Sequence, residues 1–368
     1  MPLSPLLQPV AFDDLPGWDD DDHLPAFEAF RRSAFHILTK PYRTGSLGVA
    51  FQSFAEAYAD SRETSPADSG GARRFFERHF TPALVSPGGQ AASGFVTGFY
   101  EPVVEASPVR TEKFTVPLLS RPDDLIDIDD ANRPAGLDPY LAFGRRTETG
   151  PVEYFDRAAI EQGALAGRGL EIAWLASKVD AFFIHVQGAA RLQMTDGSLK
   201  RVTYAAKSGQ RFTGIGRVLA DLGEIPLADV TMQSIRGWLA DNAGRVDEIL
   251  RQNRSYIFFR EAAVEDAELG PIAAAKVPLT SGRSVAVDRL LHTFGTPFYI
   301  DAPSLTAFGG KGFRRLMIAQ DTGSAIVGPA RGDLFAGSGD AAGEIAGVVR
   351  NAADFYALLP KALVGASP

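Results

Sequence analysis

Two aspartates near the end of the chain, Asp321 and Asp333, have the residue type and spacing for acid–base chemistry. They stand 12 positions apart, each expected where a strand meets a glycine turn, so that both could face one cleft. A carboxyl group beside apolar neighbours such as Leu334 and Phe335 has its pKa raised by desolvation, which suits a general acid. Two turn aspartates that accept backbone N–H groups would show the same spacing, and spacing alone does not decide between the two interpretations.

The segment from Asp321 to Ser324 reads Asp-Thr-Gly-Ser after an apolar run, which is also the signature of an aspartic protease, where two such aspartates share one proton. The motif occurs once, and this excludes a two-lobed protease made from a single chain. A homodimeric protease needs most of its domain downstream of the motif, whereas 44 residues follow Ser324. A protease is therefore disfavoured.

Other catalytic constellations have no support in the sequence. The histidines are scattered, without an i, i+4 pair and without cysteines nearby, which argues against a zinc site and a Ser-His-Asp triad. They are His23, His36, His79, His185 and His292, and His185 is expected to be structural, in an apolar strand. The glycines from Gly337 to Gly343 miss the dinucleotide-binding spacing by one position and precede a helix expected over 341–351. No metal and no cofactor are expected.

Composition excludes several classes of protein. The 368 residues carry a formal net charge of −8, which argues against a nucleic-acid partner. The absence of cysteine removes disulfides, thiolate metal sites and lipid attachment through Cys. No apolar run reaches the length of a membrane span, and the first basic residue is Arg31, so no signal peptide is expected in this chain.

The elements that must position the two aspartates follow the order helices, strands, helices, strands, which is not the regular βαβα of a doubly wound sheet. Residues 1–24 are rich in Pro and Asp and are expected to be a solvated lead-in that supplies helix N-caps. Apolar residues at helical spacing predict three helices, over 25–34, 51–58 and 75–80, and later a helical pair over 229–253.

Short β-prone runs bounded by Gly, Pro or Asp predict the strands. The expected strands are 95–100, 114–119, 181–186, 199–205, 256–260, 285–287, 297–301, 314–320 and 355–359. Asp196-Gly197 predicts a hairpin, and Asp156 is expected to cap a helix that ends at Gly163.

The stretch from Leu316 to Asp340 resembles the end of the membrane-bound lytic murein transglycosylase A family, its so-called 3D region. Further motifs agree with that family in the same order over about residues 94–360, beginning with Thr97-Gly-Phe-Tyr-Glu-Pro. The others are 171–174, 180–188, 204–209, 215–217, 232–238, 252–259, 278–280, 284–289 and 295–297. Agreement over that many ordered motifs is not expected by chance.

The resemblance implies a mainly β fold with α-helices. In that family a double-psi β-barrel catalytic domain carries an inserted second β-barrel domain, and the glycan lies in a groove between them. By resemblance, residues 1–102 and 244–368 are expected to form the double-psi β-barrel with its N-terminal helices, and residues 103–243 the inserted substrate-binding β-barrel.

The activity that the resemblance implies is cleavage of the β-1,4 bond between N-acetylmuramic acid and N-acetylglucosamine in peptidoglycan, leaving a 1,6-anhydro ring on the product. Because the C6 hydroxyl of the sugar attacks C1, one carboxyl group can act twice, where most glycoside hydrolases use two. Asp333 matches the family's catalytic aspartate and is expected to act as acid and then as base. Asp321 matches a second aspartate and is expected to support it.

Polar residues that match groove positions of the family are the expected substrate-binding residues, although each could instead be structural. They are Thr97, Tyr100, Gln187, Tyr204, Lys207 and Ser324. Two segments depart from the family's pattern: Ala189-Ala190 replaces a Ser or Gly pair, and Ala206 and Ser208 alter the usual Ala-Gly-Lys-Asn-Gly. These changes would alter contacts with sugars without touching the acid.

The implied partner is the glycan strand of peptidoglycan, bound by a monomer, and the implied location is the periplasm with outer-membrane association in the family. Peptidoglycan carries carboxylates, so an acidic chain needs local positive charge, which we expect from Lys207, Arg145 or Arg191, with binding that weakens as salt increases. The alternative function is a non-catalytic polysaccharide-binding protein with a double-psi barrel, since a fold does not settle function.

Overall fold

The computed structural model describes residues 2–89, 93–264 and 266–364, and the chain divides into two compact units. Unit 1 comprises Met1–Tyr100 and Glu268–Pro368, and unit 2 comprises Glu101–Ala267, so the second unit interrupts the first. Residues 244–267, assigned to the first domain from sequence, lie in unit 2. The reason is that strand β12 (Ile257–Ala262) pairs along its whole length with strand β11 (Leu199–Lys207).

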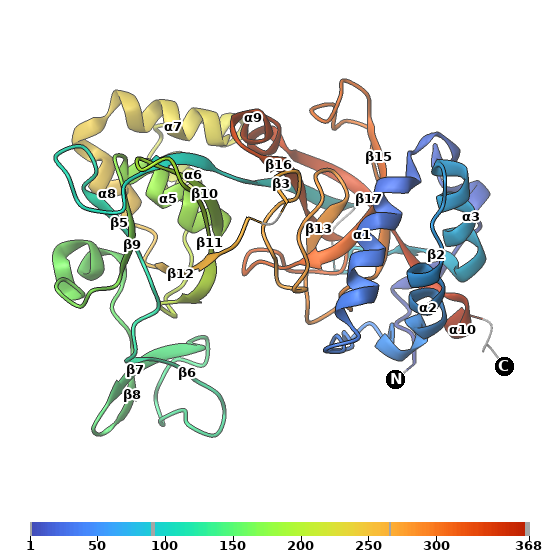
Figure 1. The fold of residues 1–368 in the computed structure, drawn as a ribbon, viewed down its shortest axis with the longest axis horizontal. Coiled ribbons are helices and arrows are strands. Elements are labelled where there is room, and N and C mark those ends of the chain that lie inside the picture. The colour runs from blue at the N-terminus through green and yellow to red at the C-terminus, as the bar shows by residue number, and fades with distance from the viewer. Residues whose placement is uncertain (1, 90–92, 265, 365–368) are drawn as a thin grey trace. The chain divides into compact units, whose positions relative to one another are not determined.

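A group of helices makes up most of the N-terminal part of unit 1, blue in Figure 1. Their bounds are η1 Phe12–Asp14, η2 Trp18–Asp20, α1 His23–His36, η3 Phe51–Phe54, α2 Ala55–Glu63 and α3 Ser69–His79. Asp22 caps α1 by accepting a hydrogen bond from the backbone N–H of Leu24, and Asp68 caps α3 by accepting one from Gly71. The three predicted helices are confirmed, although Phe80 already begins a strand.

The strands of unit 1 form one sheet, of which six strands close into a ring. Their bounds are β1 Leu7–Pro9, β2 Phe80–Val85, β3 Gly94–Glu101, β13 Ser284–Val287, β14 Pro297–Ala302, β15 Phe313–Asp321, β16 Arg331–Ser338 and β17 Arg350–Pro360; helices α9 Asp340–Val348 and α10 Lys361–Val364 flank β17 in sequence. The order is β1-β2-β17-β14-β15-β13-β16-β3, and a pairing of β3 with β17 closes the ring. β13 and β15 are parallel, whereas β13 and β16 are antiparallel.

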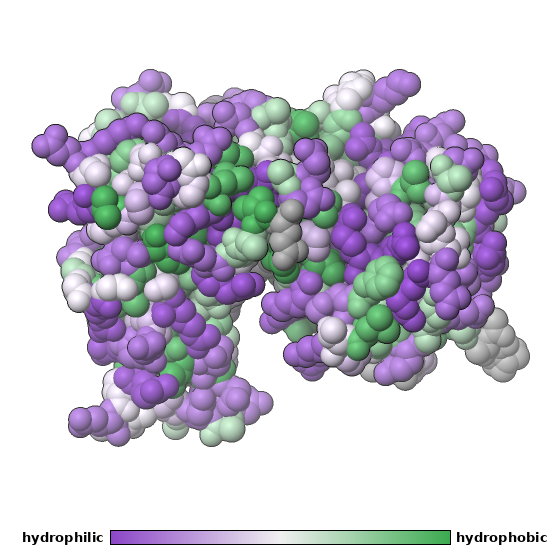
Figure 2. All heavy atoms as spheres, viewed as in Figure 1, coloured by the Kyte–Doolittle hydropathy of each residue, from purple (hydrophilic) through white to green (hydrophobic). Residues whose placement is uncertain are grey.

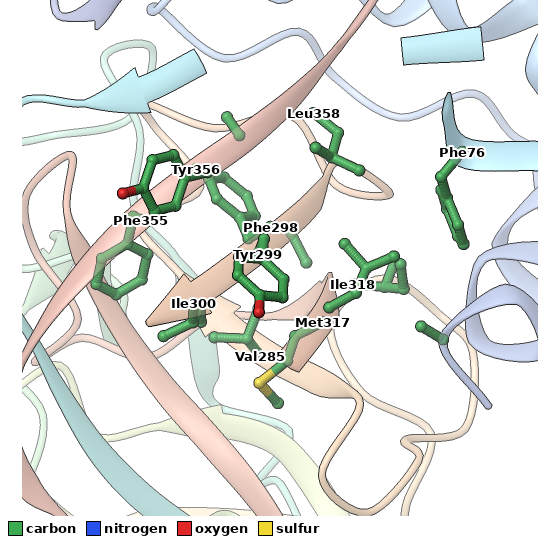
Figure 3. Packing of buried hydrophobic residues seen from close by; sticks show 14 of the residues in the cluster. Phe76, Val285, Phe298, Tyr299, Ile300, Met317, Ile318, Phe355, Tyr356 and Leu358 are labelled. Carbon is green, nitrogen blue, oxygen red and sulfur yellow. The ribbon is translucent and has the colours of Figure 1, made fainter. Parts of the chain in front are cut away.

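Side chains from these strands fill the interior of unit 1 (Figure 3). Phe298 and Ile300 of β14, Ile318 of β15 and Phe355 of β17 are all buried. Burial of each such side chain contributes about 1.5–3 kcal/mol relative to an exposed one. This packing holds the strands that carry the two aspartates in fixed positions.

One aspartate of the N-terminal acidic run is buried, contrary to the expectation of a solvated lead-in. Both terminal nitrogens of Arg283 donate to Asp21 at 2.8 Å, and the backbone N–H of Leu316 donates to it at 2.7 Å. Asp21 and Arg283 are 9% and 6% exposed. The expectation is wrong at this position because Arg283, next to the first residue of β13, places a charge in the interior that a carboxylate must balance.

Unit 2 is built around two sheets. The four-stranded sheet has the order β12-β11-β10-β4 and the two-stranded sheet pairs β5 with β9. The remaining strand bounds are β4 Val103–Ala106, β10 Ala189–Met194, β5 Val116–Leu119 and β9 Glu171–Leu175. Single bridges, Ser107 with Trp174 and Ser120 with Phe259, join the two sheets on both sides. The predicted hairpin at Asp196-Gly197 is confirmed between β10 and β11.

A third sheet of unit 2 extends away from β5 and β9 in Figure 1. It contains β6 Leu125–Asp127, β7 Phe143–Thr147 and β8 Gly150–Val152. The helices of unit 2 are α4 Arg157–Ala159, the π-helical turn η4 Ile160–Ala164, α5 Lys178–Gln187, α6 Ile215–Asp221, η5 Leu227–Asp229, α7 Met232–Asp241, η6 Ala243–Arg245 and α8 Val246–Leu250. Asp156 caps α4 as predicted, and Gly163, with φ of 102°, lies where this helix was expected to end. The helical pair over 229–253 is also confirmed.

Residues 181–186, predicted to be a strand, form most of helix α5. The hydroxyl of Ser177 accepts a hydrogen bond from the backbone N–H of Asp180 at the start of α5, and Gly188 ends it in the left-handed conformation. A short run that is apolar except for one histidine lacks the periodicity that separates a buried helix from a buried strand. His185 is buried in α5, with Nδ1 3.1 Å from a nitrogen of the buried Arg157, and so has a structural role.

A buried charge cluster lies where unit 2 begins. Glu101 is fully buried and accepts hydrogen bonds from Arg191 at 2.8 Å and from Arg201 at 2.5 and 3.1 Å. Arg191, expected to offer positive charge to a substrate, is itself buried and is hydrogen-bonded to Glu101 inside the unit. The guanidinium of Arg145 lies 4.8 Å from the ring centre of Phe155.

Hydrophilic residues predominate on the face of the molecule in Figure 2, and hydrophobic residues lie there in scattered patches. No helix in the described ranges has both the length and the apolar character needed to span a bilayer.

Candidate active site

Asp321 and Asp333 lie in one row across three neighbouring strands of unit 1. Asp321 ends β15, Asp333 is the third residue of β16, and both are paired with Ala286 of β13, the strand between them. The pairing of β13 with β15 shifts register between Val285 and Ala286, so Asp321 lies at an irregularity of the sheet. The Cα atoms of the two aspartates are about 10 Å apart, or two strand spacings. Asp333 lies within a strand and not in the predicted glycine turn.

Asp333 is held by a chain of two hydrogen bonds. The hydroxyl of Thr97 donates to Oδ1 of Asp333 at 2.5 Å, and Nη2 of Arg331 donates to the oxygen of that hydroxyl at 2.8 Å. Burial raises the pKa of Asp333, while the Thr97 hydrogen bond and the Arg331 charge act against this rise. Asp333 can therefore keep a proton at higher pH than an ordinary aspartate. The Thr97 hydroxyl bonds to Oδ1, so Oδ2 is the oxygen that can carry this proton.

Asp321 lies in a different electrostatic environment. Its Oδ1 accepts a hydrogen bond from the backbone N–H of Ala274 at 3.1 Å. Burial raises the pKa of Asp321 to about 6, and the charge of Asp333 acts in the same direction, whereas the N–H groups of Thr322 and Ala274 and the ammonium of Lys276 oppose the rise. The charge of Asp333 therefore acts on Asp321, and burial raises the pKa of both carboxyl groups.

Replacing Asp321 by Asn is expected to make folding stability less dependent on pH. The carboxyl group titrates at about 6 in the folded chain and at about 3.9 when unfolded, so the folded state alone binds its proton between these values. Because of this group, the free energy of unfolding falls by about 2–3 kcal/mol as the pH rises from about 4 to about 6. Below about pH 4 the group is protonated in both states and causes no further change. Urea unfolding at several pH values in this range measures the free energy of unfolding. The control is Asp13→Asn, which makes the same change at an exposed position. The prediction is contradicted if the free energy of unfolding depends on pH equally in Asp321→Asn and in the wild type.

The other residues expected in unit 1 differ in their surroundings. Tyr100 is buried, and its ring packs so closely against Gly343 of α9 that a Cβ at this glycine would lie 2.9 Å from it. Ser324 is exposed in the segment that follows β15. Of this group, Thr97 is the residue that the structure brings into hydrogen-bond contact with Asp333.

In unit 2, Gln187, Tyr204 and Lys207 lie near one another. Gln187 ends α5, and the carbonyl of the next residue, Gly188, accepts a hydrogen bond from the backbone N–H of Tyr204 at 2.8 Å. A β-bulge between Tyr204 and Ala206 adds one residue, so that Tyr204 and Lys207 point to the same side of β11. Tyr204 is 42% exposed.

Arg331 binds the Thr97 hydroxyl, a role that is not predicted from sequence, although Arg331 lies in the stretch from Leu316 to Asp340. Arg331 and Asp333 are two positions apart, and alternation along a strand places both side chains on one face. This signal would have been readable if residues 331–338 had been predicted as a strand instead of a glycine-rich turn. Within the described ranges, no group of three or more His, Asp or Glu side chains has the arrangement of a metal site.

Two family models match the chain in the regions that carry these residues. Residues 95–260 match the MltA specific insert domain, and residues 283–359 match the 3D domain. The first of these stretches contains most of unit 2, and the second contains Asp321, Asp333 and Arg331. The carboxylate row therefore lies wholly within the 3D domain.

Named relatives agree with these models. Membrane-bound lytic murein transglycosylase A of Escherichia coli (strain K12) is 33% identical over 256 residues, which are 68% of this chain and 61% of that protein. The crystal structure of a membrane-bound lytic murein transglycosylase from Agrobacterium tumefaciens is 53% identical, covers 98% of this chain and 99% of its own, and has a TM-score of 0.92. E. coli MltA with bound chitohexaose is 27% identical, with coverage of 98% and 95% and a TM-score of 0.69. The chain belongs to the membrane-bound lytic murein transglycosylase A family.

Proposed function

We propose that this chain is a peptidoglycan lytic transglycosylase, which cleaves the β-1,4 bond between N-acetylmuramic acid and N-acetylglucosamine and forms 1,6-anhydromuramyl products. The observation that carries the proposal is the environment of Asp333, a carboxyl group with a raised pKa and one oxygen held by Thr97. The matched chain spans about six tenths of the length of the E. coli relative, whose name describes the same activity.

In the proposed mechanism Asp333 acts twice. Protonated Asp333 gives its proton to the glycosidic oxygen, the bond from C1 to that oxygen breaks, and positive charge develops at C1. The Asp333 carboxylate then takes the proton of the C6 hydroxyl as O6 bonds to C1. The proton count at Asp333 is restored, and no water is consumed.

Asp321 has a supporting role in this proposal. Its Oδ1 accepts a hydrogen bond from the Ala274 N–H, and Asp321 lies two strands from Asp333, paired with the same residue of β13. A carboxyl group that titrates at about 6 is mostly anionic at neutral pH and can stabilise positive charge at C1.

The fold that we propose for unit 1 is the double-psi β-barrel, and for unit 2 a second β-barrel that binds substrate. The closed ring of six strands in unit 1, with its parallel pair β13 and β15, supports the first assignment. The two bridges that join the sheets of unit 2 on both sides support the second. Gln187, Tyr204, Lys207, Tyr100 and Ser324 are proposed glycan-binding residues.

The proposed substrate is the glycan strand of peptidoglycan, bound by a monomer in the periplasm, in association with the outer membrane. The crystal structure of E. coli MltA with bound chitohexaose supports a glycan ligand for the family fold. Light scattering that gives a mass other than 39.4 kDa for the purified chain would contradict the monomer.

Replacing Thr97 by Val is expected to slow turnover by about tenfold and to shift the alkaline limb of the pH–rate profile to higher pH. The hydroxyl of Thr97 stabilises the Asp333 carboxylate, so its loss raises the pKa of Asp333 further and leaves the carboxyl group less well oriented. Thr97→Ser keeps the hydroxyl and is the matched control, with activity close to wild type. An unchanged pH profile for Thr97→Val would show that this hydrogen bond does not tune the acid.

The proposed function is tested by digestion of purified peptidoglycan and mass spectrometry of the products. We expect 1,6-anhydromuramyl ends. Reducing ends alone would replace the mechanism by hydrolysis. Binding without any products would instead favour the non-catalytic polysaccharide-binding protein.

A further inference from the structure

A tight turn fixes the residues just before β13 against the end of β15. Ile272 is bridged to Pro278, and inside this turn the backbone N–H of Lys276 donates to the carbonyl of Ala273 at 2.9 Å. Two more N–H groups of the turn reach β15: that of Ala275 donates to the carbonyl of Gln320 at 3.0 Å, and that of Ala274 donates to Oδ1 of Asp321. The turn therefore holds Lys276 beside Asp321.

Lys276 adopts a backbone conformation that normally favours glycine. Its φ is 62°, and it is the one residue other than glycine with positive φ among those that the structure describes. An L-residue with a side chain pays a conformational penalty there that glycine avoids. A side chain kept at such a position beside a candidate active site points to a use for that side chain.

Lys276 carries a positive charge in a chain of net charge −8. Burial lowers the pKa of His36, and the charges of Lys276 and Lys40 lower it further. The charge of Lys276 also opposes the rise that burial causes in the pKa of Asp321, so Lys276 lies within electrostatic range of both groups. Lys276 is exposed, and no ion pair within the described part of the chain includes it. Its charge is therefore available to an anionic ligand.

We propose that Lys276 binds a carboxylate group of the substrate next to the Asp321–Asp333 row. This inference rests on the proposed function. In a peptide-free glycan strand the carboxylate is that of the lactyl group of N-acetylmuramic acid. In a peptide-bearing strand the lactyl group is an amide, and the carboxylates are those of the peptide. A chito-oligosaccharide has no carboxylate.

The test compares Lys276→Gln and Lys276→Gly, each combined with Asp333→Asn so that bound glycan is not consumed. The Gln variant removes the charge and keeps a side chain of related shape, whereas the Gly variant also relieves the backbone strain and guards against misfolding. Lys311→Gln, another exposed lysine of unit 1, is the matched control. Calorimetry at low salt measures Kd for peptide-free strands, peptide-bearing strands and chitohexaose.

Both Lys276 variants are expected to raise Kd by about fivefold for one or both muramyl ligands and not for chitohexaose, and the difference is expected to vanish at high salt. An effect confined to peptide-free strands assigns the lactyl carboxylate, and one confined to peptide-bearing strands assigns the peptide. An equal effect on chitohexaose, or no effect on any ligand, overturns the inference. Failure of the wild-type chain to produce anhydromuramyl ends would instead reject the proposed function.

Discussion

Replacing Asp333 by Asn is expected to slow glycan cleavage by about a thousandfold while leaving glycan binding nearly intact. General acid–base catalysis contributes about 10²–10⁴-fold, and the proposed mechanism uses the same carboxyl group in both steps. An amide has the shape of the carboxyl group and can still accept the Thr97 hydrogen bond, so the site keeps its structure. It cannot give a proton to the glycosidic oxygen or take one from the C6 hydroxyl.

The measurement is the initial rate of release of 1,6-anhydromuramyl products, together with Kd for soluble glycan strands. Asp13→Asn makes the same chemical change at an exposed position of unit 1 and is expected to leave both values unchanged. A rate for Asp333→Asn within tenfold of wild type would reject the assignment of the acid. Loss of binding together with loss of rate would indicate damage to the site rather than to the chemistry.

Replacing Asp21 by Ala is expected to destabilise the chain by about 3–5 kcal/mol. The variant removes the carboxylate that accepts two hydrogen bonds from Arg283 and one from the backbone of Leu316, and it leaves the Arg283 charge uncompensated in the interior. Arg283 immediately precedes β13, whose residue Ala286 lies between the two aspartates of the candidate site. Activity should therefore fall along with stability.

The same acidic run offers a matched control. Asp20 is the neighbour of Asp21 in sequence but is exposed, and Asp20→Ala is expected to change the free energy of unfolding by at most about 0.5 kcal/mol. Urea unfolding followed by fluorescence and by circular dichroism measures both variants. Equal effects of the two substitutions would show that the contact of Asp21 with Arg283 does not stabilise the fold.

Asp20 and Asp21 differ in burial, although their local sequence is nearly the same. Both residues stand in one run of aspartates, and local composition predicts a solvated segment for both. The partner that buries Asp21 lies 262 positions away. No local pattern distinguishes a carboxylate that meets a distant arginine from one that meets water.

Local patterns were sufficient where the structure is determined by neighbours in sequence. Asp156 as an N-cap and Asp196-Gly197 as a hairpin turn are confirmed because a cap or a tight turn depends on a few adjacent residues. The strand prediction for residues 181–186 is wrong because residues 181–185 are all buried, and the run therefore lacks the periodicity that identifies a helix. The edge of unit 2 at Ala267 depended likewise on a non-local strand pairing.

The sequence by itself determined which residue types are present for chemistry: two aspartates 12 positions apart, no cysteine and an excess of negative charge. Through ordered motifs it also indicated the family. Only the tertiary structure decided that Asp321 and Asp333 flank one residue of β13, that Thr97 holds Asp333, and that the Lys276 turn contacts Asp321. It also decided that Arg191 is buried in contact with Glu101. The physical reason is that pKa and available charge depend on burial and on partners brought close by folding, which distance along the chain does not encode.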